Sequence, residues 1–495
     1  MKINHTRAKS ILLGFFYPFP SPYFMKMNSK IISLTISTAL AFGVFSCDNK
    51  TKDATTTPAT DSLAYQPKFE KNYQQVYDSI QAEWPRLKAK VDYMPKEFIS
   101  INGGFKHLMF YWDTYFMNRG LLLTDTMQRF AKNNTDNLLS MVNQIGFVPN
   151  ATMAWGMNRS QPPYLSMMVR EVYEMESTKD TAWLRKNYTT LKKEYAFWMN
   201  GDKAIEDHRT PVTGLLKWSH HCSKKEVLGF YNEMKGRFNF PDDTTEEAKL
   251  KIAEPYISEA ATGWDFNPRF ENRCPDFWSV ELNTNMYVYQ MNFAYFAKEL
   301  GLKGEPDWSA AAENTKSLIN KYLWNEERGL FMDYDYVNKK FSPVASLITF
   351  QPLFYKLASK EQAAKVVDNL KLFEYDWSVT VCENTDQKKI YQWDFPAVWA
   401  PIFTLTLGGL DNYGYNQDAR RISYKYMDLI AKNFLDPKPA LVKKNGEETK
   451  RKFGQLYEKY NVLTGDIYDP EYTSMEMMDW TAAAYMEAFR YVKGK

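Results

Sequence analysis

Apolar residues recur along most of the chain at the i, i+3, i+4 spacing of amphipathic helices. Between Met127 and Gln144, the apolar positions of this pattern are Phe130, Leu138, Leu139 and Val142, with polar residues between them. The same spacing predicts helices over residues 181–199, 278–300, 308–323, 417–434 and 473–492. Strand-like stretches are short, as at Gly329–Asp335. The pattern therefore predicts a mainly helical protein.

The helical segments follow one another without a repeat of fixed period, a low-complexity tract or an internal linker. Their connections carry Pro and Gly, as at Lys303–Pro306. About a dozen helices in one unbroken domain favour an all-α toroid built of helical hairpins. A solenoid of irregular helices would show the same periodicity, so the pattern alone leaves both architectures open.

Aromatic residues are unusually frequent: 16% of the 495 residues, with 14 Trp, 33 Tyr and 32 Phe. Aromatic faces stack on the C–H faces of sugar rings, so this excess fits a carbohydrate-active enzyme. A large helical core that packs many rings explains it equally well. The net charge of +3 includes five basic residues and no acidic one within residues 1–46, which leaves about −2 for the remainder. This balance provides no concentrated basic surface for nucleic acid.

The amino-terminal residues follow the pattern of an export signal. Met25–Lys30 supplies a basic region, an apolar run continues to Phe45, and the small Ser46 precedes Cys47. The run is shorter than the roughly 20 residues of a membrane span. It resembles a bacterial lipoprotein signal, in which Cys47 is lipidated and anchors the protein to a membrane. This predicts a lipid-anchored protein of the bacterial cell envelope, periplasmic or on the outer surface; an ordinary signal peptide with an incidental Cys is the alternative.

These features divide the chain into three predicted parts. Residues 1–46 form the signal region, within which residues 1–24 fit no signal pattern and suggest that translation starts at a later Met. Residues 47–65 contain the lipidated Cys and a tether rich in Thr, Lys and Asp, which is typical of a flexible segment. Residues 66–495 form the folded domain. Neither a disulfide framework nor a metal site is indicated by the remaining cysteines, Cys222, Cys274 and Cys382.

Four segments interrupt the amphipathic pattern by grouping Trp, Asp, Arg, Asn and Gln near Gly or Pro, where loops are expected. They cover residues 102–115, 146–163, 262–269 and 392–401, and a later segment adds Glu458 and Glu471. Two groups of possible metal ligands have simpler explanations than a metal site. Asp333 and Asp335 are expected to cap turns rather than bind calcium. The adjacent residues His220–Cys222 are expected to form a loop, because neighbours in sequence cannot easily converge on one ion.

Grouped Trp and carboxyl residues suit glycoside hydrolysis. This reaction needs one carboxyl to protonate the leaving oxygen and another to activate water or to attack the sugar. A Trp beside a carboxyl partly excludes water, which raises the carboxyl's pKa towards the working range of an acid. Arg, Asn and Gln can donate hydrogen bonds to sugar hydroxyls. On chemistry alone, five carboxyls are equal candidates for the two catalytic roles: Asp113, Asp265, Asp394, Glu458 and Glu471.

The same segments resemble the trehalases of glycoside hydrolase family thirty-seven, from about Phe98 to Ala488. Residues 111–115 match the family's Tyr-Trp-Asp-x-Tyr. Residues 146–150 match its Gly-Phe-Ile-Pro-Asn, with Val for Ile, and residues 158–163 match its Asn-Arg-Ser-Gln-Pro-Pro. Its Gly-Trp-Asp-Phe-x-x-Arg is matched at residues 263–269. Its second signature is matched at residues 392–401 except that Val398 replaces a Gly. Its Glu-Lys-Tyr-Asn and a following Glu-Tyr are matched at residues 458–461 and 471–472.

The resemblance implies an (α/α)6 toroid and hydrolysis with inversion at the anomeric carbon. By this resemblance Asp265 is the general acid and Glu458 is the general base that activates water. The substrate it implies is α,α-trehalose, which is cleaved to two glucose molecules, and the reaction requires no cofactor or metal. Sugar-binding roles are implied for Trp112, Asp113, Asn150, Arg159, Gln161, Gly263, Trp264, Trp393, Asp394 and Glu471.

The chain departs from the trehalase pattern close to the predicted site. Phe105 stands where trehalases carry an Arg that contacts the sugar, with Lys106 and Leu108 in place of a Phe and a Glu. An Arg-Pro-Glu-Ser-Tyr motif has no counterpart between residues 214 and 255, and residues 466–470 replace a glycine-rich loop. Two alternatives follow. The same fold and mechanism could serve another α-glucoside or a glycan fragment, or the chain could be a non-catalytic sugar-binding lipoprotein.

Overall fold

The computed structural model describes residues 65–175, 179–200, 208, 213–386, 389, 391–439, 450–477 and 479–494. All the described residues belong to one compact unit, Ser62–Lys495. The predicted signal region, the predicted lipidation site Cys47 and nearly all of the predicted tether lie outside the described residues. Within the ranges that are described, no helix is long and apolar enough to cross a membrane.

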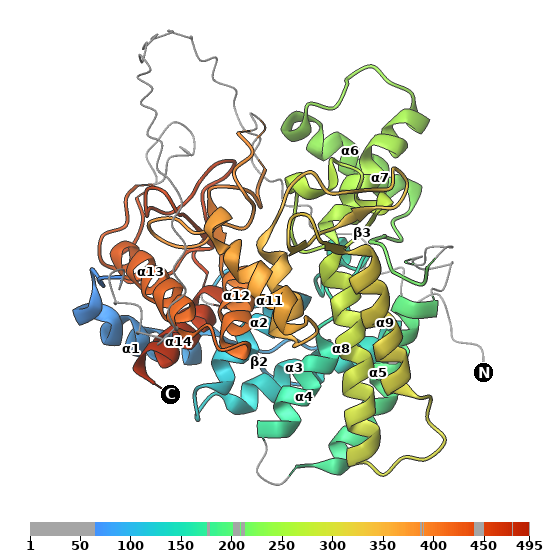
Figure 1. Cartoon of the computed structure of the whole chain (residues 1–495), viewed down its shortest axis with the longest axis horizontal. Helices are drawn as coiled ribbons and strands as arrows, with labels where there is room; N and C mark the ends of the chain where they lie inside the picture. The colour runs from blue at the N-terminus through green and yellow to red at the C-terminus, as the bar shows by residue number, and fades with distance from the viewer. Residues whose placement is uncertain are drawn as a thin grey trace, which may run out of the picture. The chain divides into compact units, whose positions relative to one another are not determined.

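Six helices of the described part form a closed inner ring (Figure 1). In chain order each contacts the next, and the last contacts the first. They are α2 (Tyr111–Leu122), α4 (Leu165–Met175), α8 (Val280–Glu299), α10 (Gln351–Phe354), α12 (Ala400–Asn412) and α14 (Trp480–Lys493). Several of them are buried around most of their circumference, as α12 is from Ala400 to Leu407. A helix that is apolar all round belongs in a core, which is why the amphipathic spacing did not reveal α2 or α12.

A second set of helices alternates with the inner ones along the chain and is amphipathic. These helices are α1 (Tyr73–Glu83), α3 (Gln128–Ile145), α5 (Thr181–Asn200), α9 (Trp308–Tyr322), α11 (Lys360–Asp368) and α13 (Asn416–Leu435). Helix α1 packs on α13 and α14. The buried Asp428 of α13 accepts hydrogen bonds from the hydroxyls of Tyr65 (2.8 Å) and Tyr73 (2.7 Å), which ties the start of the described chain to its end. Twelve alternating helices in the described residues confirm the predicted (α/α)6 toroid.

The strands are short and antiparallel. Strand β1 (Lys88–Ala89) pairs with β2 (Phe98–Ile99), and β4 (Trp324–Asn325) pairs with β5 (Leu330–Phe331). Strand β6 (Tyr334–Asp335) lies between β3 (Phe277–Trp278) and β7 (Lys340–Phe341). Strand β8 (Ala397–Trp399) pairs with β9 (Lys459–Asn461), so that Trp399 lies opposite Lys459. This last pair places the predicted Trp-Asp segment beside the predicted general base.

Short 3-10 helices connect these elements: η1 (Glu70–Asn72), η2 (Trp84–Leu87), η3 (Ala154–Gly156), η4 (Pro268–Phe270), η5 (Cys274–Asp276), η6 (Leu347–Phe350) and η7 (Leu370–Leu372). Two predicted elements need correction. Residues 329–335 are not one strand, because β5 and β6 belong to different sheets. Helix α14 begins at Trp480 rather than Thr473, because the preceding residues are extended, with Met475 and Met477 bonded to the backbone of Glu458 and Leu456.

Helices α6 (Lys224–Phe238) and α7 (Glu246–Ala260) form a hairpin (Figure 1). The hairpin has a small hydrophobic cluster of its own. Side chains at the two helix starts fix the hairpin: Ser223 forms a capping box with Glu226, and Thr245 caps α7. The cluster consists of Val227, Tyr231, Phe240, Ala253, Tyr256, Ile257, Phe266 and Tyr391. Because Phe266 directly follows Asp265, the hairpin packs against the loop that carries the predicted acid.

Candidate active site

Three predicted carboxyls come from separate parts of the toroid. Asp113 lies in the first turn of α2, Asp265 lies in the loop between α7 and η4, and Glu458 directly precedes β9. The segment containing Asp113 was expected to form a loop, but it is helical from Tyr111 onwards. Asp265 and Glu458 both act electrostatically on the pKa of Asp113. The fold therefore brings three carboxyls that are far apart in sequence into one site.

Asp265 is partly exposed and accepts no hydrogen bond from any described residue. Burial raises the pKa of Asp265 to about 6. Arg159 and Arg237 lower it, whereas Glu458 and Glu471 raise it. A carboxyl with this pKa keeps its proton into the weakly acidic range, as a general acid requires.

The backbone on either side of Asp265 has an unusual conformation. Gly263 has a φ of 77°, and a Cβ built on it would lie 2.5 Å from Cε2 of Trp112. Only glycine tolerates this close approach in a left-handed conformation. Phe266 has a φ of 63°, which is strained for a bulky residue. Gly263, for which the family resemblance implied a sugar-binding role, thus lets the loop pack directly on Trp112.

Glu458 is 6% exposed and is held by two donors. Its Oε2 accepts hydrogen bonds from Nζ of Lys459 (2.8 Å) and from the hydroxyl of Tyr472 (2.7 Å). The backbone N–H of Glu458 donates to the carbonyl of Met475 (3.0 Å). Lys459 is fully buried and its Nζ lies 3.5 Å from the centre of the Tyr472 ring. Both donors bind the same oxygen, so they fix the carboxylate. Its other oxygen, Oε1, accepts a hydrogen bond from neither of these two donors.

A further buried carboxyl, Asp479, lies near Asp113. Asp479 directly precedes α14, and neither of its side-chain oxygens has a hydrogen-bond partner of good geometry; the same holds for Oδ2 of Asp113. Burial raises the pKa of Asp113 to about 8, with Asp265 and Glu458 adding to the rise. Burial, followed by the charge of Asp113, raises the pKa of Asp479 well above its usual range. Sequence reasoning missed Asp479, because no motif surrounds it.

Two arginines act on Asp265 from different elements. Arg159 donates to Oδ1 of Asn158 (2.8 Å), and its Nε is buried without a partner. Arg237, on α6, forms an ion pair with Glu471 and donates to Oε1 of Gln392 (2.9 Å). Arg159 was predicted from its motif. Arg237 was missed, because an ordinary amphipathic helix carries it and its role depends on the hairpin's position in the fold.

Five tryptophans from four segments pack into one buried cluster. The rings of Trp393 and Trp399 stack at 3.9 Å, Trp264 stacks on Trp393 at 5.3 Å, and Trp112 lies 5.4 Å from Trp393. Trp480 closes the cluster against Trp112 at 6.1 Å. Trp112, Trp264 and Trp393 are each at most 2% exposed. They support the segments that carry the carboxyls, and their direct contact with sugar stays a prediction.

The remaining predicted binding residues also lie on this scaffold. Oε1 of Gln161 accepts from the backbone N–H of Trp112 (3.1 Å), and Nδ2 of Asn150 donates to the carbonyl of Ala260 (3.4 Å). Oδ1 of Asp394 accepts from the backbone N–H of Phe395 (2.7 Å). Glu471 is paired with Arg237, and burial raises its pKa. Tyr472 and Lys459, which adjoin predicted residues, were not themselves predicted as site residues.

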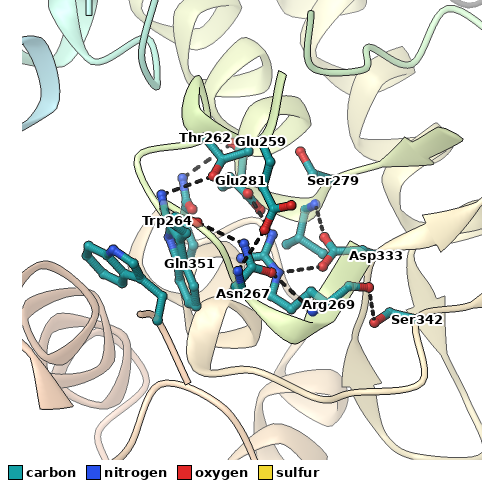
Figure 2. Close-up of polar contacts among 12 residues, drawn as sticks. Glu259, Thr262, Trp264, Asn267, Arg269, Ser279, Glu281, Asp333, Ser342 and Gln351 are labelled. Atoms are coloured by element: carbon teal, nitrogen blue, oxygen red, sulfur yellow. Dashed lines mark hydrogen bonds and ion pairs between the residues drawn. The ribbon is translucent and has the colours of Figure 1, made fainter. Parts of the chain in front are cut away.

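A buried polar network lies behind the Asp265 loop (Figure 2). Arg269 donates to Glu281 (2.7 Å) and to Asp333 (2.8 Å), and all three side chains are buried. Asp333 is therefore an ion-pair partner and not a turn cap, whereas Asp335 does cap the turn at Val337, as expected. Within the described ranges, no group of three or more His, Cys, Asp or Glu residues is arranged to hold a metal ion.

The fold is similar to that of a solved trehalase structure. Neutral trehalase Nth1 from Saccharomyces cerevisiae matches with a TM-score of 0.63 and 23% sequence identity, covering 82% of this chain and 76% of the yeast chain. At this identity, the likeness supports the fold alone. It agrees with the inner and outer rings of helices described above.

Two fungal relatives bear on the predicted location. The cytosolic neutral trehalase of Kluyveromyces lactis is 27% identical over 79% of this chain and 56% of the fungal protein. That of Beauveria bassiana is 28% identical over 70% of this chain and 52% of the fungal protein. The chain thus spans about half the length of these relatives. Their cytosolic designation contradicts the predicted lipid-anchored location in a bacterial cell envelope. That prediction relied on a short apolar run and one Cys, a pattern of low information content.

The family assignment comes from a match along nearly the whole chain. The family model described as Trehalase matches residues 50–493. This range contains every predicted site residue except the lipidation site, and it covers the complete toroid. It also includes the departures at Phe105 and at residues 466–470, so these are variations within the family. The chain belongs to the trehalase family.

Proposed function

We propose that the chain is an inverting glycoside hydrolase that cleaves α,α-trehalose, with Asp265 as general acid and Glu458 as general base. One observation carries this proposal. A carboxyl with a raised pKa, to which no described residue donates a hydrogen bond, shares a site with a carboxylate held by two donors. These are the two states that acid and base catalysis require of a carboxyl pair. Membership of the trehalase family supports the choice of substrate.

In this mechanism the proton of Asp265 passes to the glycosidic oxygen as its bond to the anomeric carbon breaks. Glu458 takes a proton from a water molecule, and the water oxygen bonds to the anomeric carbon from the opposite face. One glucose is released with its configuration inverted, and the other leaves with its configuration unchanged. Asp265 ends the cycle ionised and Glu458 protonated, and exchange with solvent restores both. An inverting pair stands roughly 6.5–9.5 Å apart to accommodate the water.

The remaining machinery follows from the same site. We infer that residues 66–495 form the catalytic domain, and that Asp113, Arg159 and Glu471 bind sugar hydroxyls together with the other predicted residues. Arg237 joins them, because it reaches Glu471 and acts on Asp265. The partner is a small saccharide. Nucleic acid is not proposed as a partner, since the net charge of +3 over 495 residues offers no basic surface.

The test is purified protein supplied with trehalose and a panel of other α-glucosides, with released glucose measured. Proton NMR during the first minutes identifies the anomers. Inversion predicts equal amounts of α- and β-glucose from trehalose, because only one of the two sugars is attacked. Initial release of α-glucose alone would show retention and contradict the proposed mechanism. No release from trehalose would contradict the proposed substrate.

A second candidate substrate is another α-glucoside. The observation that favours it is Phe105, which stands where trehalases have a sugar-contacting Arg. Its ring packs edge-on against Phe110 at 5.8 Å, so this position supplies no cation to a sugar. A higher kcat/KM for another disaccharide in the same panel would favour this candidate, whereas a clear preference for trehalose would exclude it.

A further inference from the structure

The orientation of Asp265 depends on its backbone, because no described residue donates a hydrogen bond to its side chain. Residues 262–269 form the loop that carries it. Figure 2 shows that the loop lies against a cluster of buried polar side chains drawn from α7, α8 and the strand region. What holds the loop therefore determines where the acid's proton is presented.

Glu259 makes the most direct of these contacts. It lies in the last turn of α7 and is fully buried. Its Oε1 accepts a hydrogen bond from the backbone N–H of Asn267 (2.7 Å), as Figure 2 shows. The side chain of Asn267 in turn donates to the carbonyl of Trp264 (2.9 Å). These two bonds reach the backbone on both sides of Asp265 and hold the tripeptide 264–266 as a closed turn.

The rest of the loop is also fixed, so Glu259 acts on a segment with little freedom. The Trp264 ring lies between the Arg269 guanidinium (4.4 Å) and the ring of Trp393 (5.3 Å). Arg269 is itself held by Glu281 and Asp333. Phe266 keeps its strained φ of 63° inside this turn. Such strain persists only where the surroundings determine the conformation.

We infer that Glu259 is a positioning residue for the general acid: through Asn267 it fixes the backbone that aims the Asp265 carboxyl. This inference rests on the proposed function and deepens it. A shift of about 1 Å in a catalytic group can cost on the order of 100-fold in rate. The effect of losing Glu259 should therefore appear in kcat, with KM nearly unchanged.

The charge state of Glu259 makes a conservative replacement available. Burial raises the pKa of Glu259 to about 8, with Lys389 and Arg269 lowering it and Asp265 raising it. Its other titratable neighbours are Tyr256, Cys274 and Tyr391. Burial and the charge of Glu259 both raise the pKa of each of these groups. At neutral pH the side chain is mostly a neutral acid. Glutamine keeps both that neutrality and the carbonyl oxygen that accepts from Asn267.

The experiment compares Glu259→Ala, Glu259→Gln and the control Glu254→Gln, which alters an exposed Glu on the same helix. In the full-length protein, Glu259→Ala should lower kcat for trehalose about 10- to 100-fold, with KM within about twofold of wild type. Its looser loop admits water, so the alkaline limb of the kcat/KM profile should move to lower pH. Glu259→Gln should restore kcat to within about threefold and return the alkaline limb to its original position.

Two results would overturn the inference. Glu259→Ala could keep the wild-type kcat and alkaline limb per folded molecule while merely melting earlier, which would mark a structural role alone. Alternatively, Glu259→Gln could be as impaired as Glu259→Ala, which would rule out the hydrogen bond. If Glu259→Ala does not fold, Asn267→Ala tests the same pair of hydrogen bonds around Asp265. It should shift kcat and the alkaline limb of the pH profile in the same direction as Glu259→Ala. Asp265→Asn, measured in parallel, separates the two proposals. Full activity of this variant would refute the assignment of Asp265 as the acid, but not the role of Glu259 in fixing the loop.

Discussion

On one side of the site, Asp265 receives no hydrogen bond from a described residue, and burial raises its pKa to about 6. On the other side, one oxygen of Glu458 accepts from both Lys459 and Tyr472. Two carboxyls of nearly the same chemistry thus meet opposite environments. Donors stabilise a carboxylate, and their absence in a partly dry site stabilises the protonated form. The division into acid and base follows from where the fold places hydrogen-bond donors.

The two sides also differ in how they are held. The Asp265 loop is fixed from behind by buried side chains, among them Glu259 and Arg269. The Glu458 segment is fixed by backbone pairing, through β8 and β9 and through the bond to Met475. Side-chain anchors can be removed one at a time by substitution, whereas backbone pairing cannot. The comparison can therefore be tested more finely on the acid side.

The largest effect should come from removing either carboxyl. Asp265→Asn and Glu458→Gln should each lower kcat for trehalose by roughly 10²- to 10⁴-fold, because each deletes one proton transfer. α-Glucosyl fluoride separates the two roles, since fluoride leaves without a proton. The Asp265 variant should retain turnover of this substrate and the Glu458 variant should not. The reverse pattern would exchange the two assignments. Asp243→Asn, at an exposed position, is the control.

The pH dependence should report the acid directly. The pKa of Asp265 is raised to about 6, so its proton is present below that pH and is lost above it. We expect kcat/KM for trehalose to fall about tenfold per pH unit above about pH 6, which a series of buffers from pH 4.5 to 9 would measure. A rate that stays level to pH 8 would mean that this carboxyl does not donate the proton.

A smaller effect is expected from one donor on the base side. Tyr472→Phe removes one of the two hydrogen bonds to Glu458 and leaves Lys459 in place. A hydrogen bond to a charged group contributes roughly 1.5–3 kcal/mol, so kcat should fall by about 10- to 100-fold at most. Steady-state kinetics on trehalose measures this. Tyr93→Phe removes a hydroxyl that donates to the carbonyl of His107 and not to a site carboxylate, so as a control it should leave kcat near the wild-type value.

The last prediction concerns stability. Gly263→Ala places a Cβ about where Trp112 lies and forces alanine into a left-handed conformation. Overpacking of this kind costs roughly 1–3 kcal/mol, so the melting temperature should drop. Gly103→Ala is the matched control, because a Cβ there meets no atom within 4 Å. Equal melting temperatures for the two variants would show that the loop adjusts freely around Trp112.

Sequence patterns located the motifs of the site and several of the helices, whereas the amphipathic helices α1 and α11 were not predicted. The predicted spans at 127–144, 308–323 and 417–434 agree with α3, α9 and α13 to within one or two residues. Helix α12 was missed because it is apolar on all sides, which removes the periodic signal. Arg237 and Asp479 were missed because nothing in their local sequence marks them. Each reaches the site only through packing between elements far apart in the chain.

The sequence by itself determined the mainly helical class, several helical spans, the motif residues and the set of five equal carboxyl candidates. The tertiary structure decided which of those carboxyls meets hydrogen-bond donors. It placed Lys459 and Tyr472 on Glu458, whereas no described residue donates a hydrogen bond to the partly exposed Asp265. It also buried the rings of Trp112, Trp264 and Trp393 in one aromatic cluster. The physical reason is that burial and hydrogen bonding depend on distances across the fold, which the order of residues does not contain.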